Sequence, residues 1–473
     1  CVAPGTYSPT VCVTGKGVTI RKCDPLSGGD TAAEAVFDGT GCGSSGAYLT
    51  FPSSVSSAAV RGLTFRNFGA TPILVDQASN VVIADSKFTG NSSSSDGGAL
   101  SLLNAVACSV SDCSFTGNSS TKSGGAVSSI GSVRITDCDF ADNAATTGGG
   151  DVYLSSGTVV TDCRFTGTCK AEYGAAVRMD APVDGNVLSN CTFTGISASG
   201  ASYGGFVWAK GGEIVGCSFT NNVTMGSRGV IMAQSLVSDL SVRNCLVANN
   251  GTGYKAFDFY GAGNTYTVYV DNCTIYMPSL TVFSTSTAYA TVAFLFRNSI
   301  VGGTRRENDG AFSATYENCQ LDGNCEFVCC SESDFRLRDD SPCVGAGKSL
   351  PWHEGATDIR GAARVTDGRV DIGCYQYLET DPVYYSEIRA VSSADEKTGE
   401  WADAYVGIQT AIAAARNNAR VLANFSDIAQ TTSCGVEFNG GVDLLCDHSV
   451  LARATSYTRT PTLSNSPAPQ ACR

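Results

Sequence analysis

The pattern that decides the fold lies in residues 133–140, which read Val133-Arg134-Ile135-Thr136-Asp137-Cys138-Asp139-Phe140. One pair of apolar residues flanks Arg134, and a second pair flanks Asp139. Alternation of apolar and polar residues with a period of two is typical of a strand that buries one face. The Thr-Asp pair between the two halves shifts the phase by one residue. The stretch therefore predicts two short strands joined by a bend.

The second half of this pattern recurs between about residues 60 and 325, at spacings of 20 to 28 residues. A period in this range is typical of a solenoid. No helical period separates the recurrences, which argues against a strand-plus-helix repeat. We therefore predict an all-β solenoid, a parallel β-helix whose coils stack about 4.8 Å apart. The apolar residues that end each recurrence are Phe65, Phe88, Phe115, Phe140, Phe165, Phe193, Phe219, Val247, Ile275, Val301 and Leu321.

Stacked coils place equivalent residues above one another, so the repeat predicts two ladders inside the solenoid. One is a ladder of aromatic rings at the Phe position. The other lies two residues earlier and contains Cys113, Cys138, Cys163, Cys191, Cys217, Cys245, Cys273 and Cys319. We interpret these cysteines as small apolar core residues rather than as a metal wire or a redox relay, because Ser86 and Ser299 occupy the same position. Disulfides between adjacent coils stay open as an alternative, since geometry decides them.

A second motif follows the Phe position. An Asn lies three residues after it in four coils, at Asn91, Asn118, Asn143 and Asn222. A Gly-rich corner comes next, as in Gly124-Gly125-Ala126-Val127. Asn tolerates left-handed backbone and bonds neighbouring backbone groups, and Gly permits positive φ or close packing. We therefore expect stacked corners, and we interpret the Asn-x-Ser/Thr sequons in them as corner chemistry rather than as glycosylation sites.

Composition restricts the partners and the setting. The 473-residue chain carries 31 basic and 44 acidic side chains, for a net charge of −13. This balance argues against a nucleic-acid partner, because phosphate binding needs Lys- and Arg-rich surfaces. No uncharged apolar stretch reaches the ~18 residues of a membrane span. The 22 cysteines favour an extracellular or cell-surface setting, and the 2 histidines weaken any mechanism that needs a His base or a His-ligated zinc ion.

The paired motifs, Phe-x-x-Asn and Gly-Gly-Ala followed by an aliphatic residue, cover roughly residues 60–235. Together they resemble the repeat of the chlamydial polymorphic membrane proteins. That family consists of surface β-helix passengers that act as adhesins. The resemblance implies an adhesive role at a cell surface.

Two further phrases are similar to those of secreted bacterial right-handed β-helix proteins of the pectin-lyase-like class. Residues 334–377 resemble the segment that ends the solenoid in that class, and they include Ser341-Pro342-Cys343 and Val370-Asp371-Ile372-Gly373. Gly5-Thr6-Tyr7 resembles the phrase of its first coil. The resemblance implies a right-handed β-helix over residues 1–378.

Residues 379–473 form the remaining predicted segment, a cap or an assembly element. One amphipathic helix is expected in it, because apolar residues follow helical spacing at Trp401, Tyr405, Ile408 and Ile412. In the pectin-lyase-like class such a helix usually precedes the first coil and caps the core. Three interpretations stay open: a cap on the chain's own rod, a cap on the first coil of the next molecule in a head-to-tail filament, or a fragment of a larger protein.

The pectin-lyase-like class includes lyases, which use calcium held by acidic residues and an Arg or Lys base, and hydrolases, which use paired carboxylates. The candidate catalytic residues for this alternative are Asp151, Lys170, Arg178 and Asp180. The candidates for stacking on sugars are Tyr173, Tyr203 and Trp208. These charges do not recur in register, so we interpret them as solvated surface charges. We therefore predict no catalytic residue, metal site or cofactor, with calcium entering only under the lyase alternative.

Four cysteines near residue 330 also invite a zinc interpretation. Their spacing lacks the paired Cys-x-x-Cys pattern of strong zinc sites, so we expect local disulfides among Cys325, Cys329, Cys330 and Cys343. The sequence as a whole predicts an extracellular structural or adhesive protein. Its expected partners are other copies of itself, head to tail, or a cell-surface or glycan ligand. An enzyme that cleaves polysaccharide is the alternative.

Overall fold

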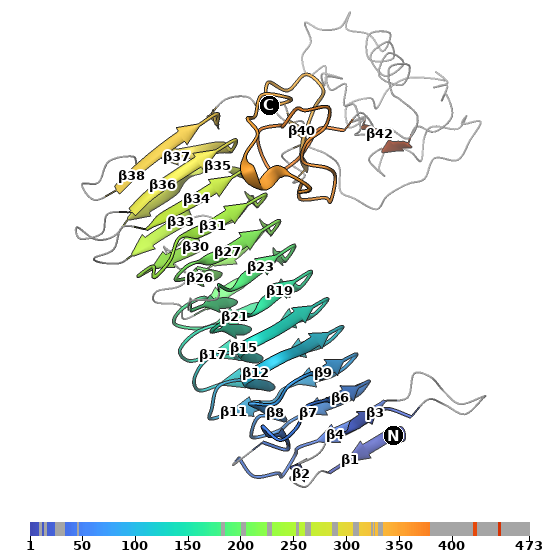
Figure 1. The fold of residues 1–473 in the computed structure, drawn as a ribbon. Helices are drawn as coiled ribbons and strands as arrows, with labels where there is room; N and C mark the ends of the chain where they lie inside the picture. Colours follow the sequence, from blue (N-terminus) through green and yellow to red (C-terminus); the bar gives the residue numbers. More distant parts are fainter. Residues whose placement is uncertain are drawn as a thin grey trace, which may run out of the picture. The chain divides into compact units, whose positions relative to one another are not determined.

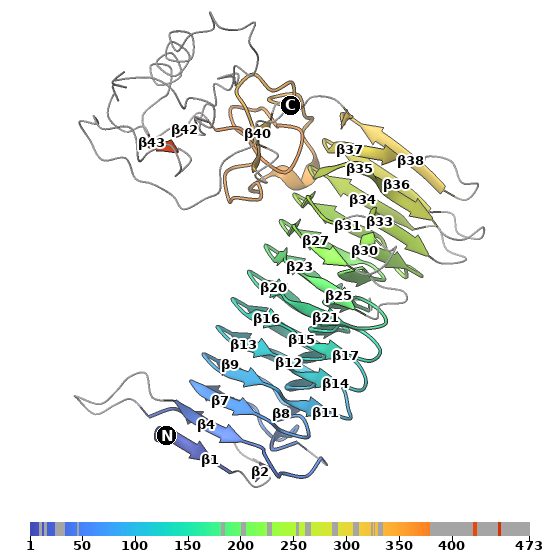
Figure 2. The same ribbon diagram turned by 180° about the vertical axis from the view of Figure 1, so that it is seen from behind.

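Every coil of the solenoid is built from short parallel strands separated by bends (Figures 1 and 2). The computed structural model describes residues 1–8, 12–13, 17–23, 34–44, 47–180, 185–199, 205–224, 229–251, 255–260, 266–285, 292–305, 312–322, 325, 327–329, 334–378, 420–422 and 443–445. The chain divides into two units, Cys1–Asp322 and Gly323–Arg473. The first unit is an all-β, right-handed parallel β-helix, which confirms the predicted fold class.

Strands that carry the Phe position pair in parallel from coil to coil. They are β1 (Gly5–Tyr7), β4 (Ala35–Asp38), β7 (Leu63–Arg66), β10 (Lys87–Thr89), β13 (Ser114–Thr116), β16 (Asp139–Ala141), β20 (Arg164–Thr166), β24 (Thr192–Thr194), β28 (Ser218–Thr220), β32 (Leu246–Ala248), β35 (Thr274–Thr285), β37 (Ile300–Arg305) and β39 (Gln320–Leu321). A separate sheet follows the Asn position and contains β11 (Ser92–Ser93), β14 (Ser119–Ser120), β17 (Ala144–Ala145), β21 (Thr168–Lys170), β25 (Ser197–Ser199) and β29 (Val223–Thr224).

Two more columns of strands complete the coils. The column after the Gly corner contains β2 (Cys12–Val13), β5 (Leu49–Phe51), β8 (Ile73–Asp76), β18 (Val152–Leu154), β22 (Val177–Met179), β26 (Val207–Ala209), β30 (Gly229–Gln234) and β33 (Lys255–Tyr260). The column before the Cys position contains β3 (Thr19–Arg21), β6 (Ala58–Arg61), β9 (Val81–Ala84), β19 (Val159–Thr161), β23 (Val187–Ser189), β27 (Gly212–Val215), β31 (Leu240–Arg243), β34 (Thr267–Asp271), β36 (Val292–Arg297) and β38 (Phe312–Glu317). Two long strands run through both columns, β12 (Leu100–Ser111) and β15 (Val127–Thr136).

The predicted aromatic ladder is present in the core. From Phe65 to Phe219, ring centroids of successive coils lie 4.5 to 5.3 Å apart and their planes are within 17° of parallel. The ladder begins earlier than the sequence predicted, because Phe37 pairs with Phe65 and Tyr7 pairs with Phe37. Aliphatic residues continue the column after Phe219, as expected.

The bend predicted between the two strands of a coil is a left-handed residue. Asp112, Asp137, Asp162 and Asn190 take φ values of 52° to 55° at equivalent positions. Asp and Asn are the non-glycine residues that adopt this conformation most readily. The shift in the alternation of apolar and polar residues within residues 133–140 is therefore caused by the predicted bend, at Asp137.

The Asn position is a buried hydrogen-bond ladder, and its residues do not use the left-handed backbone that we expected of them. The residue before each Asn adopts it instead, as Gly117 does with a φ of 65°. The Asn118 Oδ1 accepts from the backbone N and from the Nδ2 of Asn91 at 3.1 and 2.8 Å, and the Asn118 Nδ2 donates to Phe88 O at 3.0 Å. Because Asn91, Asn118 and Asn222 are fully buried, their sequons are closed to glycosylation in the folded chain.

The corners contain Gly because the next coil leaves no space for a side chain there. A Cβ at Gly125 would lie 2.0 Å from the carbonyl oxygen of Gly150 in the next coil, so no side chain fits there. The inward-facing residues after these glycines are Ala99, Ala126 and Ala176, all fully buried. Small residues therefore let adjacent corners stack.

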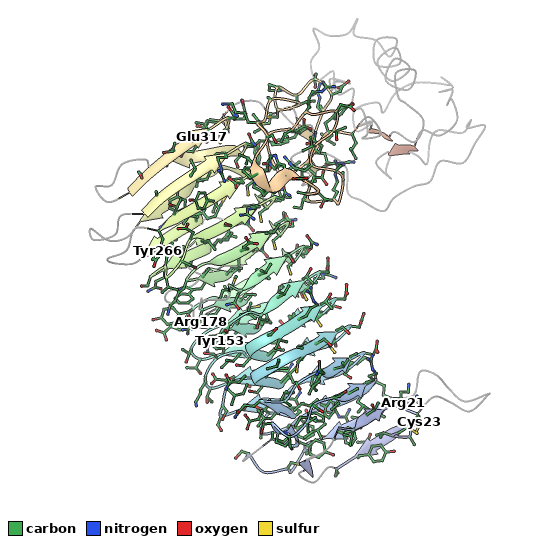
Figure 3. All side chains as sticks on the ribbon, viewed as in Figure 1. Arg21, Cys23, Tyr153, Arg178, Tyr266 and Glu317 are labelled. Atoms are coloured by element: carbon green, nitrogen blue, oxygen red, sulfur yellow. A yellow bond between two sulfur atoms is a disulfide. The ribbon has the colours of Figure 1, made fainter. Side chains whose placement is uncertain are left out.

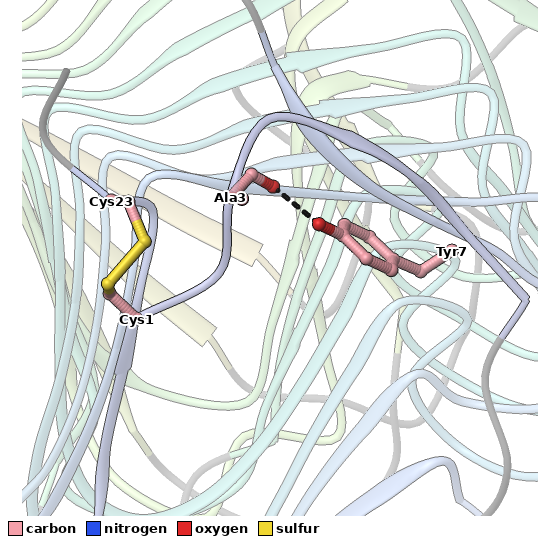
Figure 4. The surroundings of a disulfide bond; sticks show 4 residues. All are labelled: Cys1, Ala3, Tyr7 and Cys23. Carbon is pink, nitrogen blue, oxygen red and sulfur yellow. Dashed lines mark hydrogen bonds between the residues drawn. A yellow bond between two sulfur atoms is a disulfide. The ribbon is translucent and has the colours of Figure 1, made fainter.

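At the start of the first unit, Cys1 and Cys23 form a disulfide with a Cα–Cα distance of 4.9 Å (Figure 4). Val2 and Lys22 pair in parallel between them. The Tyr7 hydroxyl donates to Ala3 O at 2.8 Å in the same region.

The second unit contains short elements: β40 (Phe327–Cys329) antiparallel to β41 (Asp334–Leu337), a 3₁₀ helix η2 (Pro351–His353), and β42 (Arg420–Leu422) parallel to β43 (Asp443–Leu445). Two motif residues hold its loops together. Asp358 Oδ1 accepts from the backbone N of Arg360 and Ala362 at 2.8 and 3.0 Å, and Asp371 Oδ1 accepts from Gly345 N at 2.6 Å. Cys343 is a thiol, which differs from the local disulfide that we expected for it.

Parallel coil pairing is described as far as Leu321, whereas we predicted a solenoid through residue 378. The predicted boundary between residues 378 and 379 falls inside the second unit. The predicted helix with Trp401, Tyr405, Ile408 and Ile412 lies outside the described residues. That boundary, the helix and its cap or assembly role stay predictions.

Candidate functional site

Strands of successive coils place three large side chains in register. β18, β22 and β26 pair so that Tyr153 lies beside Arg178, and Arg178 lies beside Trp208. The neighbours of Arg178, which are Val177 and Met179, are fully buried. Because strand side chains alternate between faces, Arg178 points away from the core.

The Arg178 guanidinium lies against three aromatic rings. Its Cζ is 4.9 Å from the ring centroid of Trp208 and 5.4 Å from those of Tyr153 and Tyr173. Figure 3 shows Tyr153 and Arg178 close together on one side of the solenoid. Trp208 is only 3% exposed, and its Nε1 donates to Gln234 Oε1 at 2.8 Å. The Trp208 ring therefore packs under cations and presents little surface for a sugar.

Asp180 is the carboxylate that holds this arrangement together. It accepts from Tyr153 Oη at 2.9 Å and from Arg178 Nη2 at 3.0 Å, and Lys210 Nζ lies 3.4 Å from it. The side chains of Arg178 and Asp180 are only 15% and 19% exposed, so solvent screens their ion pair weakly. We call Tyr153, Tyr173, Arg178, Asp180, Trp208 and Lys210 the Arg178 cluster. It carries two cationic groups and one carboxylate.

Replacing Asp180 with Ala is expected to destabilise the protein by about 2 kcal/mol. Arg178, Lys210 and the Tyr153 hydroxyl would all lose the carboxylate that they share. Urea denaturation of the two proteins measures the difference in unfolding free energy. Asp139→Ala is the matched control, since Asp139 is exposed on β16, and we expect a change within about 0.5 kcal/mol. Equal losses in both variants would contradict a bracing role for Asp180.

The structure brings together some of the predicted site residues and separates others. Arg178, Asp180, Tyr173 and Trp208 belong to one cluster, which Tyr153 completes. Lys170 is exposed on β21, which belongs to a different sheet from β22. Tyr203 lies outside the described residues. Tyr153 could have been found from the sequence, because it occupies the position equivalent to Arg178 in the preceding coil.

Asp151 lies inside the solenoid, away from any surface substrate. It is fully buried and occupies the corner position that is Ala in neighbouring coils. Asn143 Nδ2 donates to its Oδ1 at 2.8 Å, and Cys169 Sγ donates to its Oδ2 at 3.0 Å. The Asn ladder lacks its next member here, so Asp151 supplies the missing acceptor. Burial raises the pKa of Asp151 to about 7, although its two hydrogen bonds oppose that effect.

Glycoside hydrolases position two carboxylates at the substrate, and the Arg178 cluster as defined contains one, Asp180. Among the described residues, no group of three or more His, Cys, Asp or Glu side chains is arranged to hold a metal ion. Within the same part of the chain, no helix has the length and hydropathy of a membrane span.

The fold and the cluster define a right-handed parallel β-helix protein with a braced polar surface site. Residues 45–204 match the family model described as the right handed beta helix region. No curated protein matches the sequence. Similarity to the chlamydial polymorphic membrane proteins stays a prediction.

Solved structures similar to this chain include two carbohydrate-related proteins. Pectate lyase Pel9A is 12% identical, with a TM-score of 0.36, over 79% of this chain and 86% of that one. A tailspike protein mutant of E. coli bacteriophage HK620 in complex with a pentasaccharide is 10% identical, with a TM-score of 0.31, over 64% of this chain and 69% of that one.

Proposed function

We propose that this chain is an extracellular structural and adhesive rod that binds an acidic glycan through the Arg178 cluster. The observation that carries the proposal is the cluster itself, in which strands of three successive coils and the segments beside them fix polar and aromatic side chains in one place. Fixed groups recognise a ligand without the entropy loss of ordering flexible side chains.

The charges of the cluster favour an acidic ligand. Asp180 already accepts from three neighbours, whereas Lys210 is 32% exposed and keeps donors for a further acceptor. Two cations against one carboxylate leave a local positive charge on an otherwise acidic chain. A sugar carboxylate or sulfate would complement that charge, and the half-buried Tyr173 would border it.

The test is binding of the purified chain to immobilised polygalacturonate, a sulfated polysaccharide and neutral dextran, with calcium present and absent. We expect saturable binding to an acidic polysaccharide and none to dextran. Replacing Lys210 with Ala is expected to weaken binding about tenfold, which corresponds to about 1.4 kcal/mol. Lys122→Ala removes an exposed lysine from another coil and serves as the control.

Three outcomes bear on the proposal. Equal binding by both lysine variants would place the ligand elsewhere on the molecule. Binding to none of the acidic polysaccharides would contradict the adhesive proposal. Release of unsaturated or shortened sugars during the incubation would favour the polysaccharide-cleaving alternative.

A further inference from the structure

Seven buried thiols line one edge of the core, one in each of seven successive coils. They are Cys113, Cys138, Cys163, Cys191, Cys217, Cys245 and Cys273, each at most 2% exposed. The proposed adhesive function uses none of them. Their number and regular placement make them the largest set of nucleophilic groups in the part of the chain that the structure describes.

Backbone hydrogen bonds fix the spacing of these cysteines directly. The carbonyl oxygen of each accepts from the residue that follows the next cysteine, at distances of 2.9 to 3.0 Å for Cys113, Cys138, Cys163, Cys191, Cys217 and Cys245. Neighbouring cysteines therefore sit at the inter-strand spacing of about 4.8 Å. Disulfides form over Cα–Cα distances of roughly 4.4–6.8 Å.

The sulfur atoms occupy equivalent places in successive coils. Cys138 Sγ lies 3.2 Å from Thr136 O in its own coil and 3.9 Å from Val110 O in the preceding coil. Cys163 Sγ repeats this placement one coil further on, at 3.2 Å from Thr161 O and 3.9 Å from Ile135 O. Equivalent sulfur atoms therefore lie above one another in the column.

The chain already closes one disulfide over a similar Cα–Cα distance. Cys1 and Cys23 flank a parallel backbone pair, and their Cα atoms are 4.9 Å apart. The inter-strand spacing of the column, about 4.8 Å, lies in the same range.

We call this row of stacked cysteines the cysteine column. We propose that it can be oxidised, so that thiols of adjacent coils form disulfides that link the coils covalently. Seven thiols in one row give at most three such disulfides at a time, for example between Cys113 and Cys138, Cys163 and Cys191, and Cys217 and Cys245. Each disulfide closes a loop of one coil and opposes uncoiling of the solenoid.

The oxidant is a small disulfide such as oxidised glutathione. One column thiolate attacks it and forms a mixed disulfide, releasing one glutathione thiol. The neighbouring cysteine sulfur then attacks the protein sulfur of the mixed disulfide and releases the second glutathione thiol. One protein disulfide forms, the glutathione disulfide is reduced, and the two protein protons end on the two glutathione thiols.

The exchange is slow while the coils are closed. Each column thiol is at most 2% exposed, so a small disulfide cannot reach it in the closed solenoid. Oxidation therefore proceeds through transient opening of the coils, and warming below the melting temperature accelerates it.

The test equilibrates the full chain, warmed, in glutathione buffers of increasing oxidation, after brief reduction of Cys1–Cys23. Intact mass and peptide mapping follow alkylation of the remaining thiols. We expect disulfides between adjacent coils only, and a higher denaturant midpoint for the oxidised protein. If all seven column thiols remain alkylatable in a buffer that restores Cys1–Cys23, or if cross-links join distant coils, the proposal fails.

Two serine variants sharpen this test. Ser299 already occupies the column, and its Oγ lies 3.0 Å from both Val270 O and Arg297 O, either of which can accept its proton, so serine fits the position. Cys191→Ser leaves three column thiols on each side of the substituted coil and is expected to lower the maximum from three disulfides to two. Cys169→Ser removes a buried thiol that binds Asp151 and lies off the column, and we expect it to leave three. Equal counts in the two variants would overturn the assignment.

Discussion

Replacing Phe140 with Ala is expected to lower the unfolding free energy by about 4 kcal/mol, the loss typical of truncating a buried Phe. Phe140 is fully buried between two parallel rings. Its centroid lies 5.0 Å from those of both Phe115 and Phe165, with interplanar angles of 6° and 8°. The variant loses apolar burial and both ring contacts, and the coils above and below it close the cavity only partly. Denaturant unfolding monitored by circular dichroism measures the change.

The matched control is Phe140→Leu. Val247 and Ile275 occupy the same column further along, so the position accepts aliphatic side chains. We expect Phe140→Leu to cost about 1.5 kcal/mol or less. A loss below about 1 kcal/mol in the alanine variant would mean that the ladder does not carry the stability of the solenoid.

Asp151→Asn is expected to stabilise the protein at pH 8 and to leave its stability unchanged below pH 4. Burial raises the folded-state pKa of Asp151 to about 7 from its ordinary value of 3.8. The folded chain therefore holds this proton where the unfolded chain has released it. The stability from the protonated carboxyl is complete below the ordinary pKa and is lost as the pH rises through about 7, and the loss is on the order of 4 kcal/mol.

An amide at position 151 keeps an acceptor for Asn143 and has no charge to bury. Unfolding free energies of both proteins at pH 4 and pH 8 provide the measurement. Other carboxyl groups titrate equally in the two chains, so the difference between the proteins isolates Asp151. A difference that does not change with pH would show that Asp151 is ionised, or protonated, throughout this range.

The core of the solenoid was predictable because one residue type recurs at one spacing. The Phe column was read correctly from Phe65 onward, since a cysteine or serine precedes most of its members by two residues. Phe37 and Tyr7 were missed because they lack that neighbour, although their spacings of 28 and 30 residues fit the period. A residue joins the aromatic ladder because of its position in the coil, whether or not a cysteine or serine lies two residues before it.

The site was harder to predict because its members come from strands that are distant in sequence. Asp151 was grouped with Arg178 on charge alone. The alignment of Gly149-Gly150-Asp151 with Gly124-Gly125-Ala126 already indicated an inward-facing residue. The cation–π contacts of Arg178 depend on which side chains face outward in adjacent coils, and the period alone does not determine them.

The most direct test of the proposed function uses the fluorescence of Trp208, which packs beneath Arg178 and lies 5.3 Å from Lys210 Nζ. The chain contains 3 tryptophans, so replacing Trp352 and Trp401 with Phe leaves Trp208 as the sole reporter. Titration with the acidic polysaccharide that binds best is expected to give a saturable change in emission, with a midpoint about tenfold higher after Lys210→Ala. Binding of the polysaccharide without any change in Trp208 emission would contradict the assignment of the Arg178 cluster as the adhesive site.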